Sequence, residues 1–550
     1  MRSRRFRYGS MSVAITALVI AAILLFNVIF SALADKYLWH VDLTRENIYT
    51  LSDNCKELLD ETFETVSDRR AEEGVTEPLK VTIKFCDLED NIMEVTAQRY
   101  VLMTAKELAD RFPEYVDIEY INIWENPTAV EKYKSSVHSA INSSDVIVES
   151  GTEFRAYKID EFYLTNSGSS TPWAYLGEKR FASAMLAVTQ AESPVAAVLT
   201  GHGEVFTDAE LVYLLEMAGY EVQLIDDLVN TELPENCRLL VCYNPTSDFL
   251  AADGVSDISE ISVLDEFLAG ENHSLMVFMS PSSPILPNLE SYLALWGIEF
   301  GRYTDNAGNT YSCTVKDAEN ALTGDGLTFI GEYETGGLGA TFTEDMRSVN
   351  NPRRVVFKNA MPITITDTYD PSFATDESTG VSYFYGNKSL GNGYSRQIYN
   401  IFTAADSSVL MANGREVASA DVNNPYGLMT ISMHYRATQE ESYVDYYKGQ
   451  LNAAFADQSS FVLACGSTEY AAEALIQSGT YGNSEALLQA LRSMGKEPVP
   501  TSLEFTPFAD STIDTLTVKR ANAYTIALTV IPAVIIFGVG IFVIVRRKYA

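Results

Sequence analysis

The sequence predicts an α/β protein anchored in a membrane by one transmembrane helix near each end. Two uncharged apolar segments, residues 11–33 and 523–545, predict the anchors. Between them, short apolar runs alternate with helical patterns, which is typical of a doubly wound parallel sheet. Nearly all of the chain's mass is therefore expected between the two anchors.

The first apolar segment, residues 11–33, is long enough to cross a bilayer. At about 1.5 Å per residue, a helix of this length spans a hydrocarbon core of about 30 Å. A cleaved signal peptide is the alternative, because Ser31-Ala-Leu-Ala34 imitates a small-x-small cleavage site. Signal peptides have a shorter apolar stretch, so an uncleaved anchor is favoured.

Basic residues flank both anchors on the side away from the middle of the chain: Arg2, Arg4, Arg5, Arg7, Arg546, Arg547 and Lys548. The positive-inside rule then predicts that residues 1–10 and 546–550 are cytoplasmic tails of a plasma-membrane protein. Residues from about 35 to 520 are expected outside the cell. Pro532 does not argue against the second anchor, since membrane helices tolerate proline.

Residues 34–175 are predicted to form an N-terminal extracytoplasmic α/β domain. The expected elements are a helix capped by Ser52, a strand at 78–85, a helix at 95–112, a strand at 116–123 and a hairpin of 145–149 with 154–159. This order suits a thioredoxin-like domain. The sequence contains no CxxC pair, so thioredoxin chemistry is not expected.

Residues 176–515 are predicted to form a doubly wound α/β domain. Nearly continuous apolar runs indicate strands buried on both faces at 194–200, 239–243 and 274–279, with a shorter strand at 221–224. Helices are expected at 180–190, 211–218 and 263–269, with another beginning near 292.

An irregular insertion is expected at about 300–440, with strands at 354–357 and 428–434. The α/β pattern then returns with a strand at 460–464 and a helix at 485–494, which are expected to complete the same sheet.

Composition and charge exclude several classes of function. The formal net charge of -35 argues against nucleic acid or an anionic membrane surface as the ligand. The sequence has no GxxxxGK[ST] motif, so ATP binding through a P-loop is excluded and no cofactor is expected. The six cysteines lack a Cys/His cluster; they are predicted to be buried and unpaired, without a metal site, although an extracytoplasmic location permits disulfides.

The most suggestive candidate site is Gly201-His202-Gly203-Glu204, which follows a predicted buried strand. Ligands of open α/β sheets bind at the carboxyl ends of strands, and an imidazole beside a carboxylate can transfer protons or bind a metal. One His and one Glu are too few for zinc, so a tight turn with an internally bonded histidine is favoured. Ser280, after the strand at 274–279, is the candidate nucleophile, but it lacks the glycines of a nucleophile elbow.

The sequence resembles the gliding-motility-associated ABC-transporter accessory proteins, a family also found as transport components in non-gliding bacteria. The resemblance covers most of the chain and is weakest over about 300–440. It is carried by Asp42-Leu-Thr, Tyr49-Thr-Leu-Ser52, Asp145-Val-Ile-Val148, residues 177–184, Leu199-Thr-Gly-His-Gly-Glu204, Asn244-Pro-Thr246, Leu275-Met-Val-Phe278 and residues 459–469.

This resemblance implies a non-enzymatic partner of a permease and a separate ATPase, with a flavodoxin- or amidotransferase-like domain that has no catalytic residues. Asn244 joins the candidate site on this ground. Some family members are fused to permease helices, but two spans cannot form a transport pathway alone.

Three functions are therefore considered. The leading hypothesis is an auxiliary subunit of a bacterial ABC transporter whose ectodomain receives or gates cargo. A cell-surface binding module for peptide or glycan, independent of a transporter, is the alternative. A hydrolase that uses Ser280 or the His202–Glu204 pair is the third, and it is disfavoured.

Overall fold

The chain is described from a computed structural model. The residues that the structure describes are 48–134, 138–165, 171–190, 193–204, 209–252, 259–270, 272–347, 352–375, 382–420, 425–436, 459–478, 480–495, 503 and 505–508, together with Leu18, Leu25 and Phe26. Residues Met1–Thr506 form one compact unit and Pro507–Ala550 a second.

The two predicted anchors, residues 11–33 and 523–545, lie outside the described residues, as do both predicted tails. Only Leu18, Leu25 and Phe26 of the first anchor are described; all three are helical and exposed. No helix within the described ranges is both long enough and apolar enough to cross a membrane.

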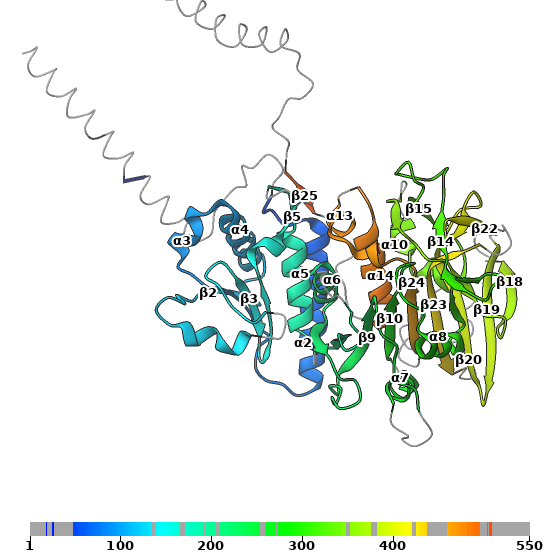
Figure 1. Cartoon of the computed structure of the whole chain (residues 1–550). Helices are drawn as coiled ribbons and strands as arrows, with labels where there is room; N and C mark the ends of the chain where they lie inside the picture. The colour runs from blue at the N-terminus through cyan, green and yellow to red at the C-terminus, as the bar shows by residue number, and fades with distance from the viewer. Residues whose placement is uncertain are drawn as a thin grey trace, which may run out of the picture. The chain divides into compact units, whose positions relative to one another are not determined.

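The N-terminal part contains a four-stranded sheet with the order β2-β1-β3-β4, in which β1 and β2 are parallel and β3 runs antiparallel to β1 (Figure 1). Its strands agree with the predicted ones: β1 (Val81–Phe85), β2 (Val116–Tyr120), β3 (Val146–Ser150) and β4 (Glu153–Tyr157). The accompanying helices are α2 (Asp53–Glu72), α3 (Glu89–Glu94), α4 (Thr96–Arg111) and α5 (Gly177–Val188).

Helix α2 begins where the sequence predicts, because the Ser52 side chain accepts a hydrogen bond from the Cys55 backbone N–H. Strand β1 alternates buried and half-buried residues, as its polar and apolar alternation requires. Helix α5 is almost entirely buried and contacts β3, β4 and α6 (Ala209–Met217). It therefore joins the N-terminal sheet to the larger sheet that follows.

The larger sheet contains five parallel strands in the order β8-β7-β9-β10-β24, as the buried apolar runs predict. In chain order the strands are β7 (Val195–Leu199), β8 (Glu221–Ile225), β9 (Cys237–Tyr243), β10 (Ser274–Phe278) and β24 (Ser459–Cys465). The expectation that the last strand completes the same sheet is confirmed, since β24 pairs with β10 in parallel.

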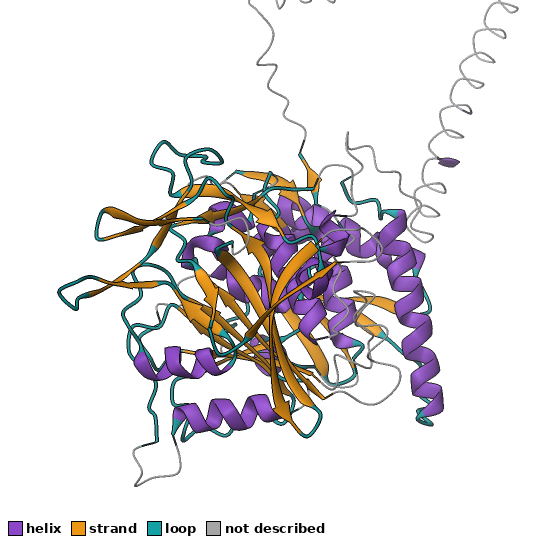
Figure 2. Cartoon of the chain, turned by 90° about the vertical axis from the view of Figure 1, so that its right-hand side faces the viewer, coloured by secondary structure: helices purple, strands orange, loops and turns teal. Residues whose placement is uncertain are grey.

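Helices cover both faces of this sheet (Figure 2). One apolar core includes residues of α6 and α14 (Asn483–Gly495), and a second core includes residues of α7 (Glu260–Ala269) and α8 (Pro287–Leu295). Helix α8 begins earlier than the sequence analysis predicts, because Pro287 occupies the first turn, where its fixed φ favours a helix.

The expectation of an irregular insertion at about 300–440 is wrong for much of its length. Strand β24 pairs antiparallel with β23 (Gly427–Arg436), which pairs with β20 (Tyr394–Thr403), and the sheet continues through β15 (Thr328–Tyr333) to β16 (Val355–Lys358). Strand β19 (Ser382–Gly391) forms a long hairpin with β20. Aromatic residues suit these strands, and Tyr385 stacks on Tyr399 across the hairpin with 5.2 Å between ring centres.

The remaining described elements are short: η1 (Pro127–Tyr133), η2 (Ile159–Phe162), β5 (Tyr163–Thr165), β6 (Pro172–Tyr175), β11 (Ile298–Phe300), β12 (Arg302–Thr304), β13 (Thr310–Ser312), β14 (Thr314–Lys316), α9 (Gly337–Thr341), α10 (Glu344–Arg347), β17 (Ile363–Ile365), β18 (Asp370–Thr375), β21 (Val409–Ala412), β22 (Arg415–Ser419), η3 (Thr468–Ala471), α13 (Glu473–Ile476) and β25 (Thr506–Pro507). Of these, β14, β21 and β22 form a small antiparallel sheet.

Candidate functional site

The candidate residues lie where the parallel strands end. Strand β7 is flanked by β8 on one side and β9 on the other, so the chain changes direction across the sheet between β7 and β9. Such a switch point is the usual ligand site of an open parallel sheet. The loop after β7 and the loop after β9 meet there, because the Thr246 and Ser247 backbone N–H groups both donate to the His202 carbonyl at 2.9 Å.

His202 is held between two carboxylates. Its Nδ1 lies 3.1 Å from Glu204 Oε1, and its Nε2 lies 3.1 Å from Glu260 Oε2 in an ion pair. Its ring stacks on Phe249 with 3.7 Å between ring centres and 9° between planes. The side chain is 6% exposed, so little of the imidazole is accessible to a ligand.

The two carboxylates also determine the protonation of His202. Burial alone lowers the pKa of His202, but the two neighbouring carboxylates, Glu204 and Glu260, outweigh burial, and the pKa lies above its ordinary value. Glu204 accepts a second hydrogen bond, from the His202 backbone N–H, at 2.6 Å. The His202 side chain is therefore bound by protein groups on both ring nitrogens. It connects the loop after β7 to Glu260 at the start of α7.

The two glycines of the loop serve close packing. A Cβ on Gly201 would collide with the carbonyl oxygen of Asp226, which follows β8. Gly203 has a φ of +71°, and its carbonyl accepts a hydrogen bond from Thr246 Oγ1 at 3.1 Å. Both glycines thus let neighbouring loops approach the end of β7.

Ser280 and Asn244 belong to the same edge of the sheet. The Asn244 backbone N–H donates to the Phe278 carbonyl at 2.8 Å, and its side-chain oxygen accepts from Ser283 Oγ at 3.2 Å. Ser280 Oγ lies 2.7 Å from Ser282 Oγ. His273 precedes β10 and Ser280 follows it, so the strand, at about 3.3 Å per residue, separates them by more than 16 Å. Within the described residues, Ser280 has no histidine partner.

A cavity of about 560 Å³ opens beside Ser280. Its walls come from the loops after β10 and β24 and from the small β14-β21-β22 sheet, and they include Lys316, Asp325, Asn413 and Glu469. Of these lining residues, only Ser280 was predicted from the sequence as a candidate. The other residues come from segments far apart in the chain, and no local pattern links them.

The six cysteines are buried and free, as predicted. Glu260, the second partner of His202, was not predicted. Its only local signal is its position in the first turn of α7, directly after the Ser259 cap.

Comparison with known protein families finds no family model that matches the chain. Comparison with curated proteins likewise finds no significant match. The assignment of function therefore depends on the sequence patterns and on the geometry described above.

Proposed function

We propose that this chain is a non-enzymatic auxiliary subunit of a bacterial ABC transporter, whose extracytoplasmic part receives or gates cargo. The observation that carries the non-enzymatic part is the state of His202, which contacts Glu204, Glu260 and Phe249 and is 4% exposed. An acid or base catalyst must reach the proton it transfers within hydrogen-bond distance, and this imidazole is enclosed by its own partners.

The fold is compatible with the domain types that the element order and the family resemblance together lead us to expect. In chain order the five parallel strands are arranged 2-1-3-4-5, which is the order of flavodoxin-like sheets. The N-terminal order β2-β1-β3-β4, with β3 antiparallel to β1, supports a thioredoxin-like arrangement. Sheets of these types carry many functions, so they support the proposal without selecting the cargo.

The transporter part of the proposal rests on the resemblance and on the two apolar segments. To take part in ATP-driven transport, a chain without a P-loop needs a separate ATPase subunit. A chain with two spans also needs a separate permease to form the transport pathway. The cavity beside Ser280 is the place where cargo would bind, since Lys316, Asp325 and Glu469 offer both signs of charge and Asn413 adds an amide.

Co-purification tests the proposal. The full chain, tagged and extracted from its native membrane in mild detergent, is expected to carry a permease and an ABC ATPase in fixed proportion. Isolation of the chain alone from gently solubilised membranes would overturn the transporter assignment. A matched pair of variants then tests the cavity: Lys316→Ala should impair transport or cargo binding, and Lys56→Ala, on the exposed surface of α2, should not.

The alternative is a transporter-independent surface module for peptide or glycan, and the same cavity favours it. Thermal-shift screening of the full chain against envelope peptides and glycans distinguishes the two. A specific hit in a chain that purifies alone favours the independent module. Any hydrolysis found should be tested in the His202→Ala, Glu204→Ala double variant, and unchanged activity there would exclude that pair as its catalyst.

A further inference from the structure

A second group of polar residues lies between the N-terminal sheet and the central sheet, away from the switch point. It consists of His138, Glu161 and Glu216, whose nearest ligand atoms all lie within 4.8 Å of one another. His138 precedes β3, Glu161 lies in η2 and Glu216 lies on α6, so three separate segments contribute one residue each. His138 Nε2 and Glu216 Oε1 are 2.9 Å apart.

The three residues converge on one point, unlike the group around His202. At His202 the two carboxylates approach opposite ring nitrogens, so an ion bound to one nitrogen could not reach both carboxylates. At His138 one ring nitrogen and one oxygen of each carboxylate come together. The arrangement at His138 is therefore compatible with metal coordination, whereas the arrangement at His202 is not.

The distances are close to those that a metal ion requires. Zinc binds nitrogen and oxygen ligands at about 2.0–2.2 Å, so two ligand atoms in a tetrahedral site lie about 3.4 Å apart. The 2.9 Å separation between His138 and Glu216 needs to widen by about half an ångström, and the other separations, none above 4.8 Å, need to close by at most about 1.4 Å.

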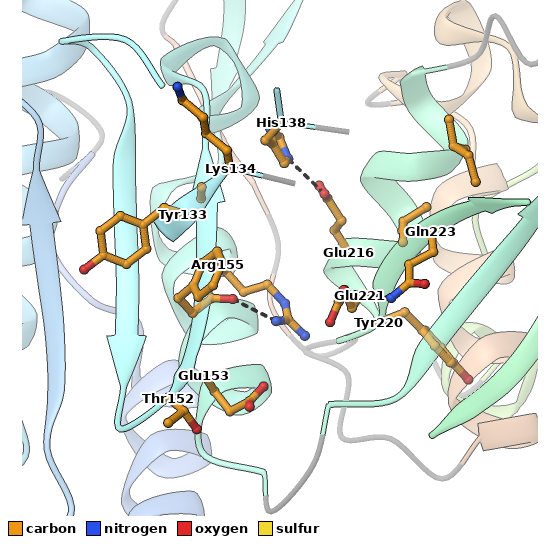
Figure 3. A pocket seen from close by; sticks show the side chains of 14 residues that line it. Tyr133, Lys134, His138, Thr152, Glu153, Arg155, Glu216, Tyr220, Glu221 and Gln223 are labelled. Carbon is orange, nitrogen blue, oxygen red and sulfur yellow. Dashed lines mark hydrogen bonds and ion pairs between the residues drawn. The ribbon is translucent and has the colours of Figure 1, made fainter. Parts of the chain in front are cut away.

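A cavity of about 530 Å³ adjoins the group and provides space for further ligands (Figure 3). His138 and Glu216 line it, and Arg155 extends into it from β4. Zinc sites that keep a position open have three protein ligands and a water or substrate. The cavity supplies such a position on one side of the cluster.

Two buried arginines point to acceptor groups that the described protein atoms do not provide. Arg155 is 8% exposed; its Nη2 donates to the Gly219 carbonyl at 3.0 Å, but within the described part of the chain its Nε has no acceptor. Arg180 is fully buried and donates to Glu161, yet its Nη1 likewise has no acceptor among the described residues. Waters or an anion bound to a metal ion would offer acceptors of this kind.

The ion pair with Arg180 does not prevent Glu161 from binding a metal ion. It pairs with Glu161 through Oε2, at 3.2 Å, which leaves the other carboxylate oxygen for an ion. A hydrogen bond from a neighbouring group to a ligating carboxylate is usual at metal sites, where it orients the ligand. Arg180 is therefore suited to position Glu161.

We propose that His138, Glu161 and Glu216 bind one divalent transition-metal ion of the zinc class, with its open position facing the cavity. This site is independent of the proposed transporter function. Because His138 and Glu161 belong to the N-terminal part and Glu216 to α6, the ion would cross-link the two parts of the compact unit.

The test is metal binding to the full chain in detergent after removal of metals with a chelator. We expect one Zn²⁺ per chain by calorimetry, and Co²⁺ should give visible absorption bands typical of nitrogen and oxygen ligands. Glu161→Gln and Glu216→Gln keep the shape of the side chain, and each should weaken zinc binding by at least about 100-fold, since loss of even an outer-shell partner costs 10–100-fold. Zn²⁺ should also raise the unfolding temperature of the wild-type chain and not of these variants.

His202→Gln is the matched control, because it removes a buried histidine that also faces two glutamates, and zinc binding should be unchanged. Circular dichroism verifies that each variant is folded. Absence of stoichiometric zinc binding by the wild-type chain overturns the proposal whatever the variants do. Binding that survives in both glutamine variants, or is lost in a folded His202→Gln chain, overturns it as well.

Discussion

The guanidinium carbon of Arg180 lies 3.9 Å from the centre of the Tyr213 ring, so a fully buried charge on α5 packs against α6. The ring of Tyr157 is a second aromatic contact, with its centre 4.8 Å from the same guanidinium carbon. Arg180 also donates to the backbone carbonyl and the carboxylate of Glu161. The Arg180 side chain thus contacts β4 and η2 in the N-terminal part and α6 beside the central sheet.

Substitution of Arg180 should therefore destabilise the protein strongly. Arg180→Ala leaves the Glu161 carboxylate half-buried without its cation, and removing one partner of a buried pair costs about 3–5 kcal/mol. Arg111→Ala is the control, since Arg111 lies over Phe112 and pairs with Asp60 at the surface, where such pairs contribute up to about 1 kcal/mol. Urea unfolding of the two variants measures the difference, and equal losses would contradict the interpretation.

The contribution of His202 to stability should decrease as the pH rises. The pKa of His202 is above its ordinary value in the folded protein, because Glu204 and Glu260 outweigh the effect of burial. The native state then holds a proton that the unfolded state releases above about pH 6.5, so this stabilisation is complete below that pH and is lost at higher pH. The free-energy difference between wild type and His202→Gln should therefore shrink between pH 6 and pH 8.

His434 provides the opposite case. Burial and the charge of Arg396 lower the pKa of His434 to about 4. Here the unfolded state binds the extra proton, so stability from the neutral ring is present above about pH 6.5 and is lost as the pH falls. The difference between wild type and His434→Gln should shrink from pH 7 to pH 5. Parallel pH trends for the two histidines would disprove the assignment for one of them.

Gly201→Ala should disturb the loop at the switch point. The added Cβ meets the Asp226 backbone carbonyl, which cannot rotate away as a side chain would, and overpacking of this kind costs about 1–3 kcal/mol. Gly324→Ala is the control, because nothing lies within 4 Å of its Cβ position and surface changes stay within about 0.5 kcal/mol. Chemical denaturation compares them; a Gly201→Ala chain as stable as the control would show that the loop can relax.

The parallel sheet was predictable because a strand buried on both faces must be almost entirely apolar, as β7 and β10 are. Of the antiparallel strands, β16 and β23 were predicted, but β15, β19 and β20 were missed because their tyrosines, threonines and glycines imitate loops. Two signals were nevertheless present: Asn392-Gly393 and Asn413-Gly414 form the turns of hairpins, with positive φ at all four residues.

The convergence of side chains was not predictable from local patterns. Glu260 meets His202 only because α7 returns to the carboxyl edge of the sheet, and nothing near either residue in the sequence indicates that contact. The same holds for His138 and Glu216, which are 78 residues apart and meet only after both parts have folded. Sequence patterns record burial and periodicity, and tertiary packing decides which polar groups share a site.

Chemical labelling should find six thiols, all protected in the folded protein. All six cysteines are free and buried, and burial raises the pKa of Cys237 to about 11 and that of Cys86 to about 12. A neutral, enclosed thiol is a poor nucleophile, so iodoacetamide at pH 8 should leave the native chain largely unmodified. After denaturation in urea without reductant, mass spectrometry should find six added groups per chain. Fewer groups without reductant, with the full number restored by reductant, would instead reveal disulfides formed in an extracytoplasmic setting.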